Sequence, residues 1–147
     1  MGLSLLFPDP GPLPKLPAPK AGQRVVIEVS GLPPYKDTRA SIRNPKHRFY
    51  QRFVDLRRVA IASMAGRAWY SGPIGFELVL YAPAMERTLG EFAGGIADTL
   101  DGSHGFSFTY LPIVYQDDCQ IESMNLEHAF AKEPHYRLII RFLQPPE

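Results

Sequence analysis

A length of 147 residues suits a single domain, and a composition with 45% hydrophobic and 21% charged residues excludes a disordered or fibrous chain. The single cysteine, Cys119, excludes an internal disulfide, and no histidine or cysteine pair has the spacing of a structural zinc site. Apolar runs are too short for a transmembrane helix, and the apolar N-terminus lacks the basic start of a signal peptide, so the sequence predicts a cytoplasmic protein with no membrane contact.

The net charge of +1 conceals a division of charge along the chain. Residues 36–67 carry nine Lys or Arg against two Asp, whereas residues 77–133 carry ten Asp or Glu against one Arg and one Lys. A basic segment can neutralise phosphates, and clustered carboxylates can hold a hard cation such as Mg²⁺. The division therefore favours metal-dependent nucleic-acid chemistry, and the alternative is two helices with solvated faces of opposite sign.

The chain begins with a proline-rich segment. Residues 1–22 contain six of the fifteen prolines, which leaves few backbone donors and few helical backbone angles. This composition predicts an extended, disordered tail over residues 1–22, followed by a single domain over residues 23–147. The tail is either a proline-rich ligand for a protein partner or an untethered terminus.

Two strands and one helix are predicted in the first half of the domain. Residues 24–30 and 74–81 alternate their side chains with the period of a strand. Between them, Asn44 can cap a helix that has Pro45 at its first position and runs to about Ala65. Apolar side chains recur along this helix at helical spacing, and most basic side chains lie off that stripe.

A second helix and three further strands are predicted after residue 81. Thr88 and Glu91 have the spacing of a capping box, and apolar side chains continue at helical spacing to Leu100. Three glycines interrupt this helix and call for either a packing reason or a close neighbour. Strands are predicted over residues 106–115, 119–124 and 136–142. The order of elements predicts an α/β fold of the α+β type, with a mixed sheet of about five strands and two main helices.

Carboxylates are the clearest candidates for chemistry, because the sequence has no motif for a serine nucleophile, a P-loop or a dinucleotide site. Glu91 and Asp98 are seven residues apart and fall on one side of the second helix, with Asp101 about 60° further round. Asp117 and Asp118 follow in a turn. An ordinary solvated helix face and an ordinary turn composition are the alternatives.

Three segments resemble the RusA family of Holliday-junction resolvases. They are residues 29–34 (VSGLPP) with the basic stretch after them, residues 98–100 (DTL), and residues 117–121 (DDCQI). Proteins of that family are small homodimeric α/β endonucleases that cut four-way DNA junctions with Mg²⁺ held by aspartates. The resemblance therefore implies a RusA-like domain that acts on branched DNA as a homodimer.

The sequence departs from the family's pattern at the start of the second helix. An alignment on Asp98 puts Thr88 and Gly90 where the family has two metal-binding aspartates, and Gly94 where it has a lysine. With these family residues missing, the resemblance implies an altered carboxylate site. Its catalytic residues would be Asp98, Asp117, Asp118 and Glu91, and its ligands for Mg²⁺ or Mn²⁺ would be Asp117, Asp118 and Glu91.

The basic stretch is expected to contact DNA phosphates. The residues expected to do so are Lys36, Arg39, Arg43, Lys46 and Arg48. The resulting hypothesis is a Mg²⁺-dependent endonuclease that cuts branched DNA such as Holliday junctions. The alternative is a catalytically inactive protein of the same fold that binds DNA or a protein partner.

Overall fold

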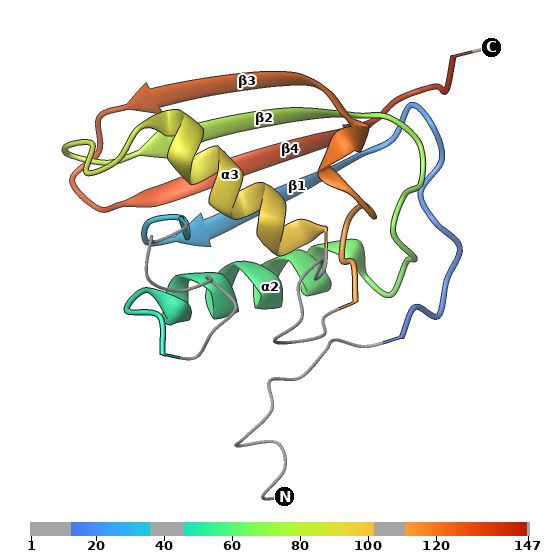
Figure 1. The fold of residues 1–147 in the computed structure, drawn as a ribbon, viewed down its shortest axis with the longest axis horizontal. Helices are drawn as coiled ribbons and strands as arrows, with labels where there is room; N and C mark the ends of the chain where they lie inside the picture. The colour runs from blue at the N-terminus through green and yellow to red at the C-terminus, as the bar shows by residue number, and fades with distance from the viewer. Residues whose placement is uncertain (1–12, 36–45, 102–110, 147) are drawn as a thin grey trace, which may run out of the picture.

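The structure is a computed structural model and describes residues 13–35, 46–101 and 111–146. Four strands form one mixed sheet in the order β1-β4-β2-β3 (Figure 1). The strands are β1 (Arg24–Ser30), β2 (Ile74–Tyr81), β3 (Ile121–Ala129) and β4 (His135–Phe142). β4 runs antiparallel to both β1 and β2, whereas β3 runs parallel to β2. The expected α/β class with a mixed sheet is confirmed.

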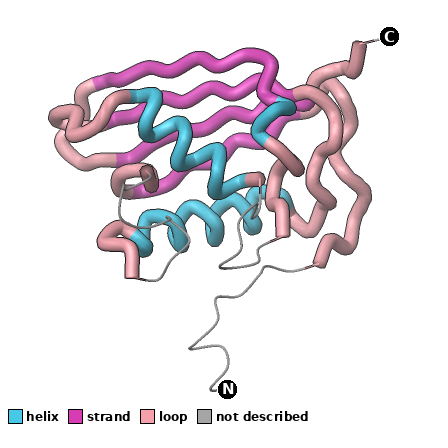
Figure 2. Tube along the Cα trace, in the orientation of Figure 1, coloured by secondary structure: helices cyan, strands magenta, loops and turns pink. Residues whose placement is uncertain are grey.

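Two helices, α2 (Tyr50–Met64) and α3 (Leu89–Leu100), cover one face of the sheet (Figures 1 and 2). α2 packs beside β1, α3 packs beside β3, and the two helices contact each other. β1 and β4 alternate buried and exposed residues, so their buried side chains point toward the helices. The core between the layers includes Ile27, Leu56 and Phe92, none of which has any exposed surface. No helix in the described ranges is long and apolar enough to span a membrane.

The expectation of about five strands is wrong for the part of the chain that the structure describes. The strand expected over residues 106–115 falls partly outside the described residues, and its described end makes only an isolated bridge between Tyr115 and Tyr70. Pro112 has no N–H to offer to a strand neighbour, which is consistent with irregular backbone here. β3 also begins later than expected, at Ile121, because a short 3₁₀ helix occupies Asp118–Gln120.

The first helix is shorter than expected. The predicted cap, Asn44 and Pro45, lies outside the described residues, and α2 begins only at Tyr50. Before it, residues 46–49 form turns in which the backbone N–H of Phe49 donates to Nδ1 of His47 (3.0 Å). α2 ends where Ala65 takes a left-handed conformation with φ 54°.

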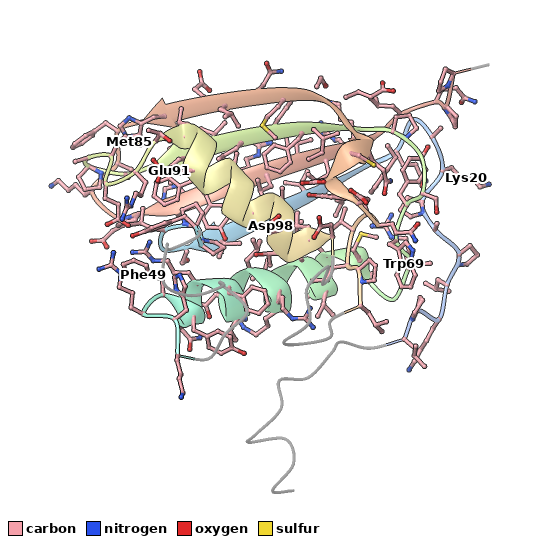
Figure 3. The ribbon with its side chains drawn as sticks, viewed as in Figure 1. Lys20, Phe49, Trp69, Met85, Glu91 and Asp98 are labelled. Carbon is pink, nitrogen blue, oxygen red and sulfur yellow. The ribbon has the colours of Figure 1, made fainter. Side chains whose placement is uncertain are left out.

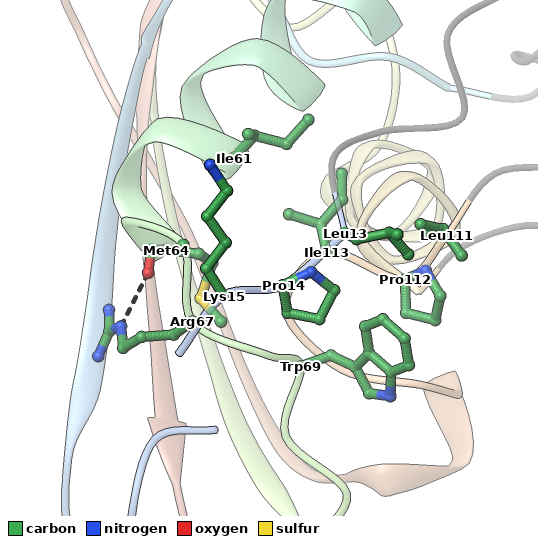
Figure 4. Close-up of a pocket in the computed structure, with 11 residues that line it drawn as sticks. Leu13, Pro14, Lys15, Ile61, Met64, Arg67, Trp69, Leu111, Pro112 and Ile113 are labelled. Carbon is green, nitrogen blue, oxygen red and sulfur yellow. Dashed lines mark hydrogen bonds between the residues drawn. The ribbon is translucent and has the colours of Figure 1, made fainter. Parts of the chain in front are cut away.

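Part of the proline-rich segment runs along the domain. Residues 1–12 lie outside the described part of the chain, but the N–H groups of Lys15 and Leu16 both donate to the carbonyl of Gly66 (2.8 and 3.0 Å). A cavity of about 230 Å³ lies beside these residues and the C-terminal end of α2 (Figure 4). Its walls include Pro14 and Trp69. The segment from residue 13 therefore packs on the domain.

Candidate functional site

Three aspartates from two segments meet beside the C-terminal end of α3. Asp98, Asp101 and Asp118 each place one carboxylate oxygen within 4.8 Å of the others. Asp98 is half-buried, Asp101 is only 2% exposed, and Asp118 is exposed. Figure 3 shows Asp98 at this end of the helix. We call these three residues the aspartate cluster. It lies at the border between the protein interior and solvent.

α3 supplies two of the three carboxylates. Asp98 and Asp101 are three residues apart, and side chains at that spacing lie on neighbouring turns of one helix face. Asp101 is the residue that ends α3, with φ −97° and ψ 3°. A negative charge is disfavoured at a helix C-terminus by the helix dipole, and burial adds a desolvation cost. Hydrogen bonds or nearby positive charges must therefore offset the cost of placing these carboxylates here.

The third carboxylate, that of Asp118, is brought to the helix end by the segment before it. The backbone N–H groups of Ile113 and Val114 donate to the carbonyl of Leu100 at 3.0 and 3.2 Å. These bonds satisfy a carbonyl that the helix itself leaves open at its C-terminus. They also fix the chain against α3 a few residues before Asp118.

Tyr115 lies beneath the aspartate cluster. Its side chain is fully buried, and its hydroxyl donates to the carbonyl of Ala97 at 3.1 Å. Burial raises the pKa of Tyr115 well above its ordinary value, and the negative charges of Asp101, Asp118 and Asp98 raise the pKa further. Tyr115 is therefore a neutral hydrogen-bond donor that anchors residue 115 to α3.

The turn that carries Asp118 is held by its neighbours. Asp117 caps the 3₁₀ helix by accepting a hydrogen bond from the backbone N–H of Cys119 (3.0 Å). A hydrogen bond to Asp117 also raises the pKa of the exposed Cys119 thiol. Oε1 of Gln120 accepts from the N–H of Asp117 (2.8 Å), and its Nε2 donates to the carbonyls of Tyr70 and Gly72 (2.9 and 2.7 Å).

Glu91 lies at the other end of α3. Its backbone N–H donates to the hydroxyl oxygen of Thr88 (3.1 Å), and its carboxylate pairs with Arg87 (3.7 Å). Seven residues of helix, about 10 Å, separate it from Asp98. Figure 3 shows the two side chains at opposite ends of α3.

The structure therefore brings together two of the four residues expected to be catalytic, Asp98 and Asp118. Asp117 serves as a helix cap beside them, and Glu91 lies two turns away. Asp101 was not among the expected site residues, although its spacing of three from Asp98 was a usable signal. Tyr115 had no signal in the sequence, since only the fold brings it beneath the carboxylates.

A groove of about 440 Å³ runs from Asp118 between α3 and β3. The helix wall of the groove includes Gly90 and Gly94, and a Cβ at Gly94 would meet no atom within 4 Å. These are two of the positions at which the resolvase pattern has an aspartate and a lysine. The third such position, Thr88, is the N-cap of α3.

The residues expected to contact DNA are only partly described. Lys36, Arg39 and Arg43 lie outside the described residues. Lys46 and Arg48 are exposed just before α2. Arg48 contacts Tyr35 and Phe49, and Figure 3 shows Phe49 at the start of α2, away from Asp98 of the aspartate cluster.

Comparison with known proteins adds no family assignment. No protein-family model matches this chain, and none of the curated proteins matches it in sequence.

Proposed function

We propose that this protein is a Mg²⁺-dependent endonuclease that cuts branched DNA, with Asp98, Asp101 and Asp118 as its cation ligands. The observation that carries this proposal is the approach of three carboxylate oxygens to within 4.8 Å at the border between interior and solvent. The resemblance of residues 98–100 and 117–121 to RusA resolvases supports the choice of DNA junctions as substrate.

The aspartate cluster fits a magnesium ion. Mg²⁺ binds oxygen ligands at about 2.1 Å, so two ligands of one ion lie at most about 4.2 Å apart. The three carboxylate oxygens lie within 4.8 Å of one another, so only a small adjustment of the side chains is needed to reach that range. Mg²⁺ commonly uses one or two protein carboxylates and fills its remaining positions with water and substrate phosphate. Mn²⁺ accepts the same oxygen donors.

Each residue has a defined part in this proposal. Asp101 and Asp98 hold their carboxylates on a rigid helix, whereas Asp118 faces solvent, where a phosphodiester can approach. Tyr115 keeps its proton and fixes the chain before Asp118. A bound cation would supply a bound water of lowered pKa and positive charge beside the phosphate.

The experiment is incubation of the purified protein with an end-labelled four-way junction and with matched linear duplex. Native and denaturing gels are run with Mg²⁺, with Mn²⁺ and with EDTA. The expected result is metal-dependent nicking of the junction that Asp118→Asn and Asp101→Asn abolish. Asp55→Asn is the matched control, because Asp55 is a carboxylate on α2 that pairs with Arg58 on the surface (3.8 Å).

A junction that is shifted on the native gel but uncut in every metal would instead favour the alternative function, a DNA-binding protein with no nuclease activity. Cleavage that survives Asp118→Asn would move the active site away from the aspartate cluster. Cleavage lost equally with Asp55→Asn would mean that the carboxylate variants act through stability alone.

A further inference from the structure

Three arginines surround two aromatic rings near the N-terminal ends of α2 and α3. The guanidinium carbon of Arg52 lies 3.9 Å from the ring centre of Phe49, and that of Arg48 lies 4.6 Å from the same ring. The guanidinium carbon of Arg87 lies 4.6 Å from the ring centre of Tyr35. The two rings pack against each other with their centres 5.2 Å apart. We call these three arginines and two rings the arginine cluster.

Tyr35 contacts all three arginines, of which Arg52 is the most distant at 5.9 Å from the ring centre. Its ring lies beneath Arg87, and its hydroxyl accepts a hydrogen bond from Nη2 of Arg48 (3.3 Å). Tyr35 itself is only 2% exposed and also packs edge-on against Phe92 in the core (5.7 Å). Because the ring is fixed in the core, it holds the guanidinium groups of Arg48 and Arg87 in place.

The third arginine is more deeply placed. The side chain of Arg52 is 20% exposed and pairs with Glu86 (2.8 Å), whereas that of Arg87 is 40% exposed. Arg52 therefore acts as a positioning residue, and Arg48 and Arg87 face solvent. The three arginines of the cluster outnumber the two carboxylates that pair with them, those of Glu86 and Glu91.

We infer that the arginine cluster is a second nucleic-acid contact, in which Arg48 and Arg87 bind backbone phosphates of the strand that reaches the aspartate cluster. Guanidinium groups bind phosphate oxygens through pairs of N–H donors, and stacking on aromatic rings orients these groups at the surface. The backbone N–H groups at the ends of the two helices add favourable potential for anions. This inference rests on the proposed function and adds to it the path of the DNA.

α3 separates Arg87, which precedes its N-terminal end, from Asp98 and Asp101 at its C-terminal end. The helix has 12 residues, so its axis is about 18 Å long. At about 3.4 Å of rise per phosphate along one strand, this length corresponds to roughly five nucleotides. Gly90 and Gly94 lie between the ends, on the groove beside β3, and without side chains they let a backbone approach the helix closely.

The test is the affinity of the full chain for a fluorescent four-way junction, measured in EDTA over a series of salt concentrations. Arg48→Gln/Arg87→Gln is expected to bind about tenfold or more weakly, with a salt slope smaller by about two. The matched control is Arg137→Gln/Arg141→Gln, which removes two arginines that pair with Glu28 and Glu77 (3.8 and 3.3 Å) on the other face of the sheet. This control should stay within about twofold of the wild type.

Three results would overturn the inference: no binding by the wild type, equal weakening in both double variants, or unchanged binding by Arg48→Gln/Arg87→Gln. The cleavage assay detects failure of the proposed function, independently of this binding assay. If the wild type binds the junction in EDTA through Arg48 and Arg87 and yet fails to cut it in Mg²⁺, the arginine cluster is a DNA contact. In that case the aspartate cluster is not a nuclease centre. Loss of cleavage with full binding in Asp118→Asn supports both proposals.

Discussion

Gly95 of α3 lies directly against the backbone of Tyr35. A Cβ added to Gly95 would lie 2.6 Å from the Cα of Tyr35 and 2.0 Å from the carbonyl oxygen of Pro34, distances that real Cβ atoms do not show. The segment after β1 therefore crosses α3 where the helix has no side chain. Since Tyr35 holds Arg48 and Arg87, this close approach also positions the arginine cluster.

Replacement of Gly95 by alanine is expected to destabilise the fold. The added methyl group meets backbone, which cannot rotate away, so Gly95→Ala should lower the free energy of unfolding by about 2–3 kcal/mol. Gly94→Ala is the matched control, because its Cβ would meet nothing within 4 Å. Alanine is the better helix former, so Gly94→Ala should raise the stability by up to about 1 kcal/mol. Urea unfolding measures both, and equal shifts would contradict the packing role of Gly95.

Regular elements with a clear period could be predicted from the sequence. β1 and β2 have the predicted bounds, because their side chains alternate cleanly, and α3 begins where the capping signal of Thr88 and Glu91 puts it. The start of α2 could not be predicted, because residues 46–49 have helical composition but form turns in which Phe49 packs against Tyr35. The glycines of α3 indicate a structural reason in the sequence, but which glycine is required, and that Tyr35 is its neighbour, is visible only in the fold.

The candidate site could be predicted only in part. Asp98 and Asp118 were proposed together from the resemblance to a resolvase, but no helical periodicity relates residues twenty positions apart in different segments. Their approach depends on the hydrogen bonds that dock residues 113 and 114 on the carbonyl of Leu100. Asp117 and Asp118 are adjacent residues of the same type, so the sequence does not show which of them joins the site. The structure shows that Asp117 caps the 3₁₀ helix and that Asp118 joins the aspartate cluster.

A divalent cation is expected to stabilise the protein through the aspartate cluster. Binding to the folded state alone adds about 2.7 kcal/mol when the free cation is at a hundred times its Kd. The melting temperature should therefore rise with Mg²⁺ or Mn²⁺ in the wild type and in Asp55→Asn. Asp118→Asn should lose this rise, because it removes one of the three proposed cation ligands. A retained rise in Asp118→Asn would place cation binding elsewhere.

Gln120 is expected to be important for both stability and the site. Its side chain bonds to the carbonyls of Tyr70 and Gly72 and to the N–H groups of Asp117 and the residue before it. Gln120→Ala should lower the free energy of unfolding by about 2–4 kcal/mol, at about 1 kcal/mol per bond. Gln51→Ala, which removes one exposed bond to Asp55 on α2 (2.9 Å), should cost less than about 1 kcal/mol.

The same substitution separates positioning from stability. If Gln120 holds the turn that carries Asp118, Gln120→Ala should weaken the cation-dependent rise in melting temperature as well as the fold. A variant that loses stability but keeps the full rise would show that the turn is positioned by other contacts.

Alkaline pH is expected to destabilise the fold through two buried tyrosines. Burial is the largest cause that raises the pKa of Tyr115 and of Tyr136, so both keep their protons in the folded state. In the unfolded state they ionise near pH 10. The contribution of the two protonated tyrosines to the free energy of unfolding is therefore complete below about pH 10. Above pH 10, the free energy of unfolding should fall by about 1.4 kcal/mol per pH unit for each tyrosine.

Tyr136→Phe tests this dependence directly. The hydroxyl of Tyr136 has no hydrogen-bond partner among the described residues, so its removal should leave the stability at pH 7 unchanged or slightly higher. Above pH 10, the variant should lose stability more slowly, by about half of the tyrosine contribution. Urea unfolding at pH 9, 10 and 11 measures the slope. An unchanged slope would mean that Tyr136 releases its proton in the folded state, through local opening of the packing around its ring.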